Sequence, residues 1–154
     1  MKDDEKILSQ FDLRQFLTYR LSKLQNALNA QAGHVLASHG DITLTEWRIL
    51  YILRSMSTAT MSQIVKESRL DKAQISRAIK GLVDKGLIAS VQDERDQRRQ
   101  LLSATAEGRA LKEKILPIMM RRQEAMTEGL TQAEIDTFIK VLDQLDETAL
   151  RREF

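Results

Sequence analysis

Apolar residues recur along most of this 154-residue chain at the three-to-four-residue spacing of helices that bury one face. The first such stretch spans about 8–32, and we expect Gly33 and then Gly40 to break it. Proline occurs once and glycine six times, which favours helices over a turn-rich β fold. Five further helices are expected, one after Thr43 and the others over about 61–67, 72–85, 105–127 and 132–150. The pattern therefore predicts a mainly α protein with six helices.

Helix-capping sequences precede several of these stretches. A threonine or aspartate is followed three residues later by glutamate or glutamine, the pattern of a capping box in which each residue satisfies a free backbone N–H. The pairs are Thr43 with Glu46, Thr60 with Gln63, Asp71 with Gln74, and Thr131 with Glu134. Thr105 is placed to cap the helix that follows it, and Gly86 to end the helix before it in the left-handed region.

The apolar period becomes strand-like between residues 87 and 103. Segments 87–92 and 99–103 predict two strands joined by a charged tip, and residues 56–60 could add a short connecting strand. A tip that leaves the protein body has no core to hold it, so charge pairs would have to stiffen it locally. We expect Asp93 and Asp96 to orient neighbouring arginines by charge-assisted hydrogen bonds. A plain charged hairpin in water is the alternative.

The stretch 72–85 predicts a helix with two different faces. Its inward positions by helical spacing are Ile75, Ala78, Ile79, Leu82 and Val83. Its outward side chains are of types that bind bases and phosphates, and no acidic residue occurs within 72–83. A short helix, a tight turn, this second helix and a hairpin form a winged helix-turn-helix. The candidate DNA-binding residues are Thr60, Ser62, Lys72, Gln74, Ser76, Arg77, Lys80, Arg95, Gln97 and Arg98, with Arg95 as the minor-groove probe.

Composition narrows the function classes. Net charge is only +2, but segment 61–100 has three more basic than acidic residues, which suits a polyanion partner. The chain has no cysteine, which excludes a disulfide framework and cysteine-based redox sensing. No phosphate loop, metalloprotease motif or nucleophile elbow is present, so we expect neither an enzyme nor a cofactor or metal site. Without a signal peptide or a membrane span, a cytoplasmic location is expected.

The hairpin and its surroundings resemble the MarR family of bacterial transcription regulators. The resemblance rests on Asp93-x-Arg95-Asp96-x-Arg98, Leu101–Leu102 and Thr105-x-x-Gly108, together with 44–50 and 70–88. The order of six helices also matches over essentially the whole chain. Ala104 departs from the pattern, since the family more often has leucine before the threonine, and we expect weaker packing where the next helix starts.

The resemblance implies an intertwined homodimer that places two winged helices on a pseudo-palindromic double-stranded DNA operator. Segments 8–36 and 105–154 would supply the dimerisation helices, and 43–103 the DNA-binding lobe. The apolar side chains expected at the interface are Phe11, Leu13, Phe16, Leu17, Leu130, Phe138, Leu142, Leu145 and Leu150. Independently, these terminal helices carry more apolar surface than a thin monomer covers easily, although packing within the chain must take some of it.

Family members also bind small anionic or phenolic molecules, so the resemblance implies a repressor released by an aromatic or acyl carboxylate. The candidate pocket residues are Arg20, His34, Trp47, Arg48 and Tyr51. Each has a plainer interpretation, and Trp47 fits the core better. Two other functions remain open: a winged helix used only as a protein-interaction module, and a nonspecific architectural DNA binder. Exposed polar residues on 72–85 favour DNA, because a protein-binding face should expose apolar anchors.

Overall fold

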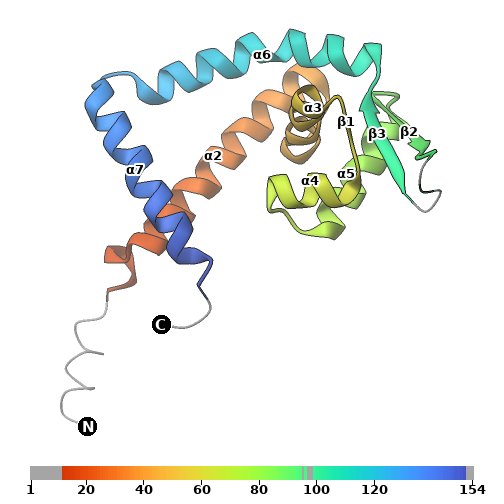
Figure 1. The fold of residues 1–154 in the computed structure, drawn as a ribbon. Coiled ribbons are helices and arrows are strands. Elements are labelled where there is room, and N and C mark those ends of the chain that lie inside the picture. The colour runs from red at the N-terminus through yellow and green to blue at the C-terminus, as the bar shows by residue number, and fades with distance from the viewer. Residues whose placement is uncertain (1–11, 95, 97–98, 152–154) are drawn as a thin grey trace. The chain divides into compact units, whose positions relative to one another are not determined.

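The computed structural model describes residues 12–94, 96 and 99–151, and it confirms a mainly α protein with a small wing (Figure 1). The helices are η1 (Leu13–Gln15), α2 (Leu17–Gly40), α3 (Leu44–Met56), α4 (Met61–Ser68), α5 (Lys72–Asp84), α6 (Ala106–Thr127) and α7 (Gln132–Ala149). Two compact units divide the chain between Ile115 and Leu116, within α6. No helix in the described part of the chain combines the length and hydropathy needed to cross a membrane.

The first long helix does not end where the glycine pattern predicted. Helix α2 continues through Gly33 to Gly40 and stops at Asp41, whose φ of 50° lies in the left-handed region. A glycine inside a helix costs only about 0.5–1 kcal/mol relative to alanine. Burial of Ala32 and Leu36, on either side of Gly33, offsets that cost. The expected break at residue 33 was therefore wrong, because tertiary packing outweighs the local preference.

Local capping determines where most of the helices begin. Reciprocal capping boxes form at Thr43 with Glu46, Thr60 with Gln63, and Thr131 with Glu134. The Asp71 carboxylate instead accepts from the backbone N–H groups of Ala73 and Gln74, at 3.0 and 3.1 Å. Asp71 thus caps α5 without the predicted return bond from Gln74.

A three-stranded antiparallel sheet lies beside these helices (Figure 1). Strand β3 (Gln100–Ala104) is central, with β1 (Thr58–Ala59) on one side and β2 (Ile88–Gln92) on the other. Ala59 pairs with Leu102, and Ile88 pairs with Ala104. The apolar side chains of this sheet join a core whose fully buried members are Leu36, Ile49, Leu50, Ile64, Ile75, Leu82 and Ile115.

Helix α6 starts directly against the residues that follow α5. Gly86 (φ 68°) ends α5 as predicted, with Gly86 N–H donating to the Val83 carbonyl and Leu87 N–H to the Leu82 carbonyl. Thr105 donates from its hydroxyl to the Gly86 carbonyl at 2.8 Å and from its N–H to the Leu87 carbonyl at 3.1 Å. A Cβ at Gly108 would collide with that same Leu87 carbonyl. Glycine is therefore required for this close approach.

Candidate nucleic-acid interface

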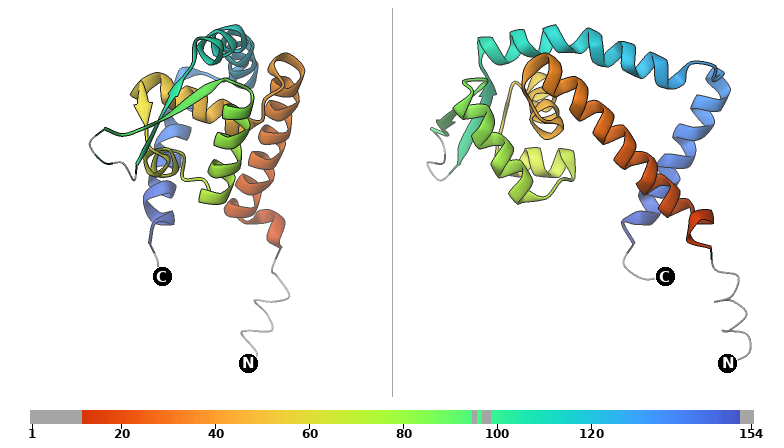
Figure 2. Two further views of the ribbon diagram at one scale, coloured as in Figure 1. Left: turned by 90° about the vertical axis from the view of Figure 1, so that its right-hand side faces the viewer. Right: turned by 180° about the vertical axis from the view of Figure 1, so that it is seen from behind.

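Helices α4 and α5 form the predicted helix-turn-helix, and both views of Figure 2 place them next to one another. Three residues connect them. Arg69 ends α4 in the left-handed region (φ 52°), Leu70 N–H donates to the Ser68 hydroxyl at 3.3 Å, and Asp71 caps α5. A connection of this length turns one helix sharply onto the next. It leaves the N-terminal half of α5 accessible.

The two faces of α5 differ in burial much as the spacing predicts. Ile75, Ala78, Ile79 and Leu82 are buried. The side chains on the other face are all exposed: Lys72, Gln74, Ser76, Arg77 and Lys80. Val83 was expected inside but is 40% exposed, because it lies at the edge of a buried stripe that is only one side chain wide at Leu82. The exposed face of α5 therefore carries positive charge and hydrogen-bonding groups, with no acid between residues 72 and 83.

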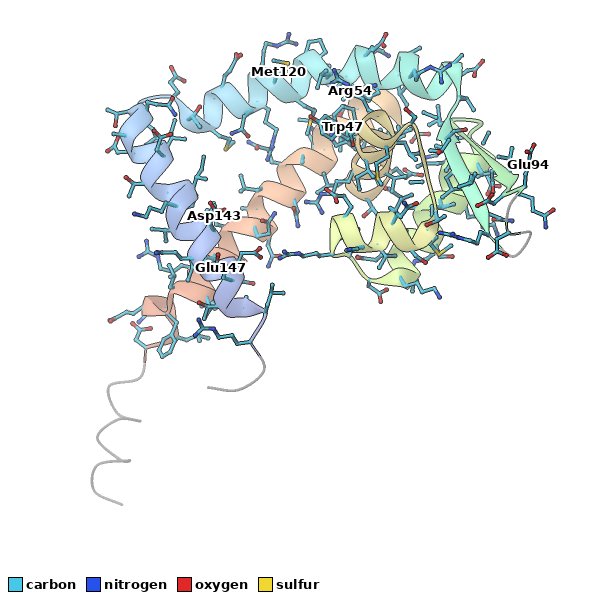
Figure 3. The ribbon with its side chains drawn as sticks, viewed as in Figure 1. Trp47, Arg54, Glu94, Met120, Asp143 and Glu147 are labelled. Atoms are coloured by element: carbon cyan, nitrogen blue, oxygen red, sulfur yellow. The ribbon has the colours of Figure 1, made fainter. Side chains whose placement is uncertain are left out.

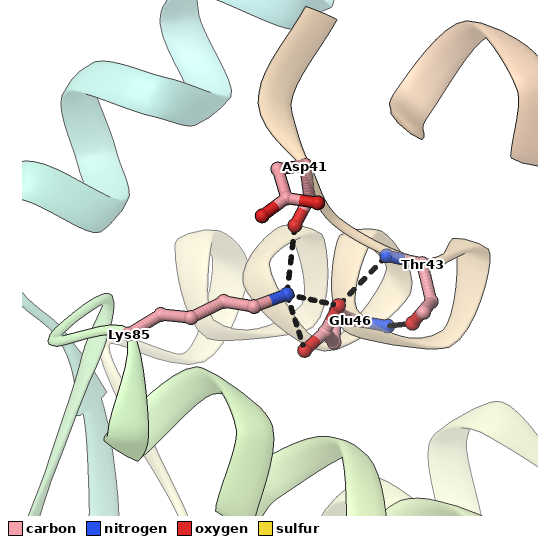
Figure 4. Close-up of polar contacts among 4 residues, drawn as sticks. All are labelled: Asp41, Thr43, Glu46 and Lys85. Carbon is pink, nitrogen blue, oxygen red and sulfur yellow. Dashed lines mark hydrogen bonds and ion pairs between the residues drawn. The ribbon is translucent and has the colours of Figure 1, made fainter. Parts of the chain in front are cut away.

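A buried carboxylate holds the C-terminal end of α5 in place (Figure 4). Glu46 is 4% exposed, and the Lys85 ammonium donates to both of its carboxylate oxygens at 3.1 Å. The same ammonium donates to the Asp41 carbonyl at 2.7 Å, and Glu46 also accepts from Thr43 N–H at 2.7 Å. One ion pair thus joins the end of α2, the start of α3 and the end of α5. The sequence does not announce it, because 39 residues separate its two members.

The wing consists of β2 and β3, which lie at the edge of their unit in Figure 2. Asp93 N–H donates to the Arg99 carbonyl at 2.9 Å, and Arg99 N–H to the Asp96 carbonyl at 2.8 Å, which closes the strands toward the tip. Glu94, labelled in Figure 3, is exposed there. Three predicted DNA contacts, Arg95, Gln97 and Arg98, lie outside the described residues. The orienting role of Asp93 and Asp96 stays a prediction.

The start of α4 divides the two remaining candidate contacts. Thr60 is buried, and its hydroxyl accepts from Gln63 N–H in the capping box, so the structure gives it a capping role. Ser62 is exposed and lines a cavity of about 360 Å³ together with Arg99 and Gln100 of the wing. Ser62 therefore remains on the accessible surface between α4 and the wing, whereas Thr60 does not.

The five predicted ligand-pocket residues do not converge on a described cavity. Trp47 is buried, as its plainer interpretation required, and Arg48 donates to the Asn29 side chain at 3.4 Å. Arg20, His34 and Tyr51 are exposed. A different cavity, of about 210 Å³, lies between the end of α3, strand β3 and the start of α6. Its wall is formed by Leu50, Leu53, Arg54, Ser57, Ala104, Gly108, Arg109 and Lys112.

Within the described ranges, no three or more histidine, aspartate or glutamate side chains gather as metal ligands. The site instead combines a helix-turn-helix, an exposed basic recognition face and a wing. These features define a winged helix DNA-binding protein.

Comparison with known proteins gives the family. The MarR family model matches residues 42–99, and the chain belongs to this family of transcription regulators, which are not enzymes. The transcriptional repressor YetL of Bacillus subtilis is 27% identical over 82% of this chain and 77% of its own length. A MarR/EmrR family regulator from Acinetobacter sp. ADP1 superimposes with a TM-score of 0.83 at 27% identity, covering 90% of this chain and 98% of its own.

A third similar protein is BpsR of Bordetella bronchiseptica, whose DNA binding is regulated by 6-hydroxynicotinic acid. It superimposes with a TM-score of 0.81 at 22% identity, covering 88% of this chain and 96% of its own. At that identity the likeness shows the shared fold.

Proposed function

We propose that the chain is a homodimeric repressor that recognises a pseudo-palindromic operator and is released from it by a small organic anion. The observation that carries the proposal is the exposed face of α5, where cations and hydrogen-bonding side chains stand together without an acid among them. A groove in DNA offers the complementary phosphates and base edges.

Base recognition falls to the N-terminal half of α5. A glutamine pairs in two places with adenine, and an arginine with guanine, in the major groove. Gln74 and Arg77 are therefore assigned to bases, with Ser76 beside them. Lys72 and Lys80 are assigned to phosphates, and so is Ser62 at the start of α4. Arg95, outside the described residues, keeps the minor-groove role that its place in the wing predicts.

Exposed apolar side chains on the terminal helices support the homodimer. No described α7 side chain is buried, although Phe138, Ile139 and Leu142 lie on one stripe of that helix. Asp143 and Glu147, labelled in Figure 3, belong to its polar side. Leu13, Phe16 and Leu17 are about half exposed near the start of α2, and Leu130 and Leu150 flank α7 equally exposed. So much apolar surface on one chain fits an interface with a second copy. Phe11 lies outside the described residues.

The repressor role and the ligand are supported by similarity. YetL is a repressor, and DNA binding by BpsR responds to an aromatic carboxylate. A ligand that binds the free protein better than the DNA-bound protein lowers operator affinity, and operator DNA lowers ligand affinity by the same factor.

Selection of bound genomic fragments by the purified full chain tests the proposal. Fragments should share a pseudo-palindromic motif, and affinity for it should exceed affinity for random duplex by about 10³–10⁷. Enrichment of no motif with uniform affinity would instead indicate a nonspecific architectural binder. Absence of binding to any duplex would favour the protein-interaction module.

A further inference from the structure

The cavity of about 210 Å³ beside the end of α3 contains three cationic side chains and no acidic one. Arg54 comes from α3, where Figure 3 labels it, and Arg109 and Lys112 come from the first two turns of α6. Leu50 and Leu53, both almost fully buried, supply an apolar wall between them. An apolar wall beside converging cations is the composition of a site for a small organic anion.

Lys112 makes this arrangement unusual. The residue is only 7% exposed, yet its ammonium forms no hydrogen bond or ion pair with any described residue. A buried cation without a partner is costly. No fully enclosed side-chain nitrogen in the described part of the chain lacks a partner, so the Lys112 ammonium retains some access to solvent, which fits its place in the cavity wall. An anion in the cavity would supply the missing partner.

The neighbouring arginines differ in how they are held. Arg109 donates from one guanidinium nitrogen to the Ala104 carbonyl at 2.6 Å, which anchors it at the cavity wall and leaves its other N–H groups free to donate. Arg54 is exposed and has no hydrogen bond or ion pair with a described residue. One buried and two more accessible cations thus face the same small space.

The small side chain of Ala104 keeps the cavity open. Ala104 lines it, at the position where the MarR pattern more often has leucine. Three more carbon atoms there would occupy part of a space of about 210 Å³. Pockets for drug-sized ligands measure about 300–1,000 Å³, so only a compact molecule fits.

We propose that this cavity binds a small organic carboxylate, with its anionic group on Lys112 and its apolar body against Leu50 and Leu53. The inference rests on the proposed function, because it gives the expected ligand a place. That place differs from the group around Arg20, Arg48 and Tyr51 suggested by the sequence.

The cavity is also connected to the recognition helix. Arg109 and Lys112 lie on the turns of α6 that follow Thr105 and Gly108, and these two residues contact Gly86 and Leu87 immediately after α5. A ligand that repositions the start of α6 therefore acts on the end of α5. Carboxylate binding and operator binding should affect each other reciprocally.

Calorimetric titration of the full chain, without DNA, tests the site with benzoate as the probe. Benzamide, a neutral analogue, and inorganic phosphate serve as comparisons. Benzoate should bind, with Lys112→Met weakening its binding roughly tenfold to a hundredfold. Lys114→Met, an exposed lysine on the same helix, is the matched control and should leave affinity unchanged. Ala104→Leu should block binding without altering charge, and Lys112→Arg should restore most of it.

Absence of benzoate binding to the unaltered chain would overturn the inference. So would equal binding of benzamide, equal losses in Lys112→Met and Lys114→Met, or binding of phosphate alone. If Lys112→Met fails to fold, Ala104→Leu and Arg54→Gln decide the question. Operator affinity, measured separately, distinguishes the two proposals: DNA binding without benzoate binding defeats only this inference, and benzoate binding without DNA binding defeats only the regulator.

Discussion

The Lys85 ammonium lies 3.1 Å from both carboxylate oxygens of Glu46, and this pair ties the recognition helix to the start of α3. Lys85→Met removes the partner of a nearly buried carboxylate. Loss of one member of a fully buried pair costs about 3–5 kcal/mol. Because the Lys85 side chain is 36% exposed, we expect a smaller loss, ~1–3 kcal/mol, in the free energy of unfolding measured with urea.

A double-mutant cycle with Glu46→Gln isolates the pair. If the two members interact as the distances indicate, the double variant should lose less stability than the two single losses added together. Lys66→Met, an exposed lysine on α4, is the control. Strict additivity of the two substitutions would show that the pair is not coupled.

Gly108→Ala should destabilise the protein by roughly 1–3 kcal/mol, because the new methyl group would meet the backbone carbonyl of Leu87. Gly33→Ala is the matched comparison. It places the same methyl inside α2, where nothing lies within 4 Å, and should raise stability by about 0.5–1 kcal/mol. Thermal unfolding of both variants checks the opposite signs. Similar shifts for the two would argue against the close contact between Gly108 and Leu87.

Arg77→Ala should relax base preference at one operator position, with a cost of about 1–3 kcal/mol on the preferred sequence. Arg121→Ala removes an equally exposed arginine from α6 and should leave the preference unchanged. Affinities for operators altered one base pair at a time measure the effect. A uniform loss on every sequence would assign Arg77 to a phosphate instead.

Phe138→Glu should dissociate the proposed homodimer, since it places a charge on the exposed apolar stripe of α7. Sedimentation velocity should then report a single chain, and operator affinity should fall with it. Gln144→Glu introduces the same charge at another exposed position of α7 and should preserve the dimer. An intact dimer in Phe138→Glu would remove this stripe from the interface.

Glu134→Gln should reduce the acid sensitivity of folding. The Thr131 backbone N–H, followed by the Thr131 hydroxyl, lowers the pKa of the Glu134 carboxyl below its ordinary value. That stabilisation is fully present above the ordinary glutamate pKa of about 4.3 and is lost as pH falls through the lower pKa in the folded chain. Urea midpoints across pH 2–6 should therefore vary less in the variant than in the unaltered chain (~pH scale as in). The same slope in both would mean that the cap does not couple to folding.

Helix starts were predictable from sequence because a capping box involves only four consecutive residues, as at Thr43 and Thr131. The exposed face of α5 followed from spacing for a similar reason. The end of α2 was not predictable in this way, because burial on either side of Gly33 decides it. The Glu46–Lys85 pair and the cavity at Lys112 also escaped, since each brings together side chains from separate elements that only the folded chain places side by side.

Helix α5 divides its labour around its circumference. Its buried stripe, its Asp71 cap and the anchor at Lys85 hold it in position, whereas its outward side chains contribute little to that placement. New operator preferences can therefore arise by exchanging those outward side chains while the scaffold stays intact. Descendants of one such regulator could diverge in the promoters they govern without first sacrificing the ability to fold.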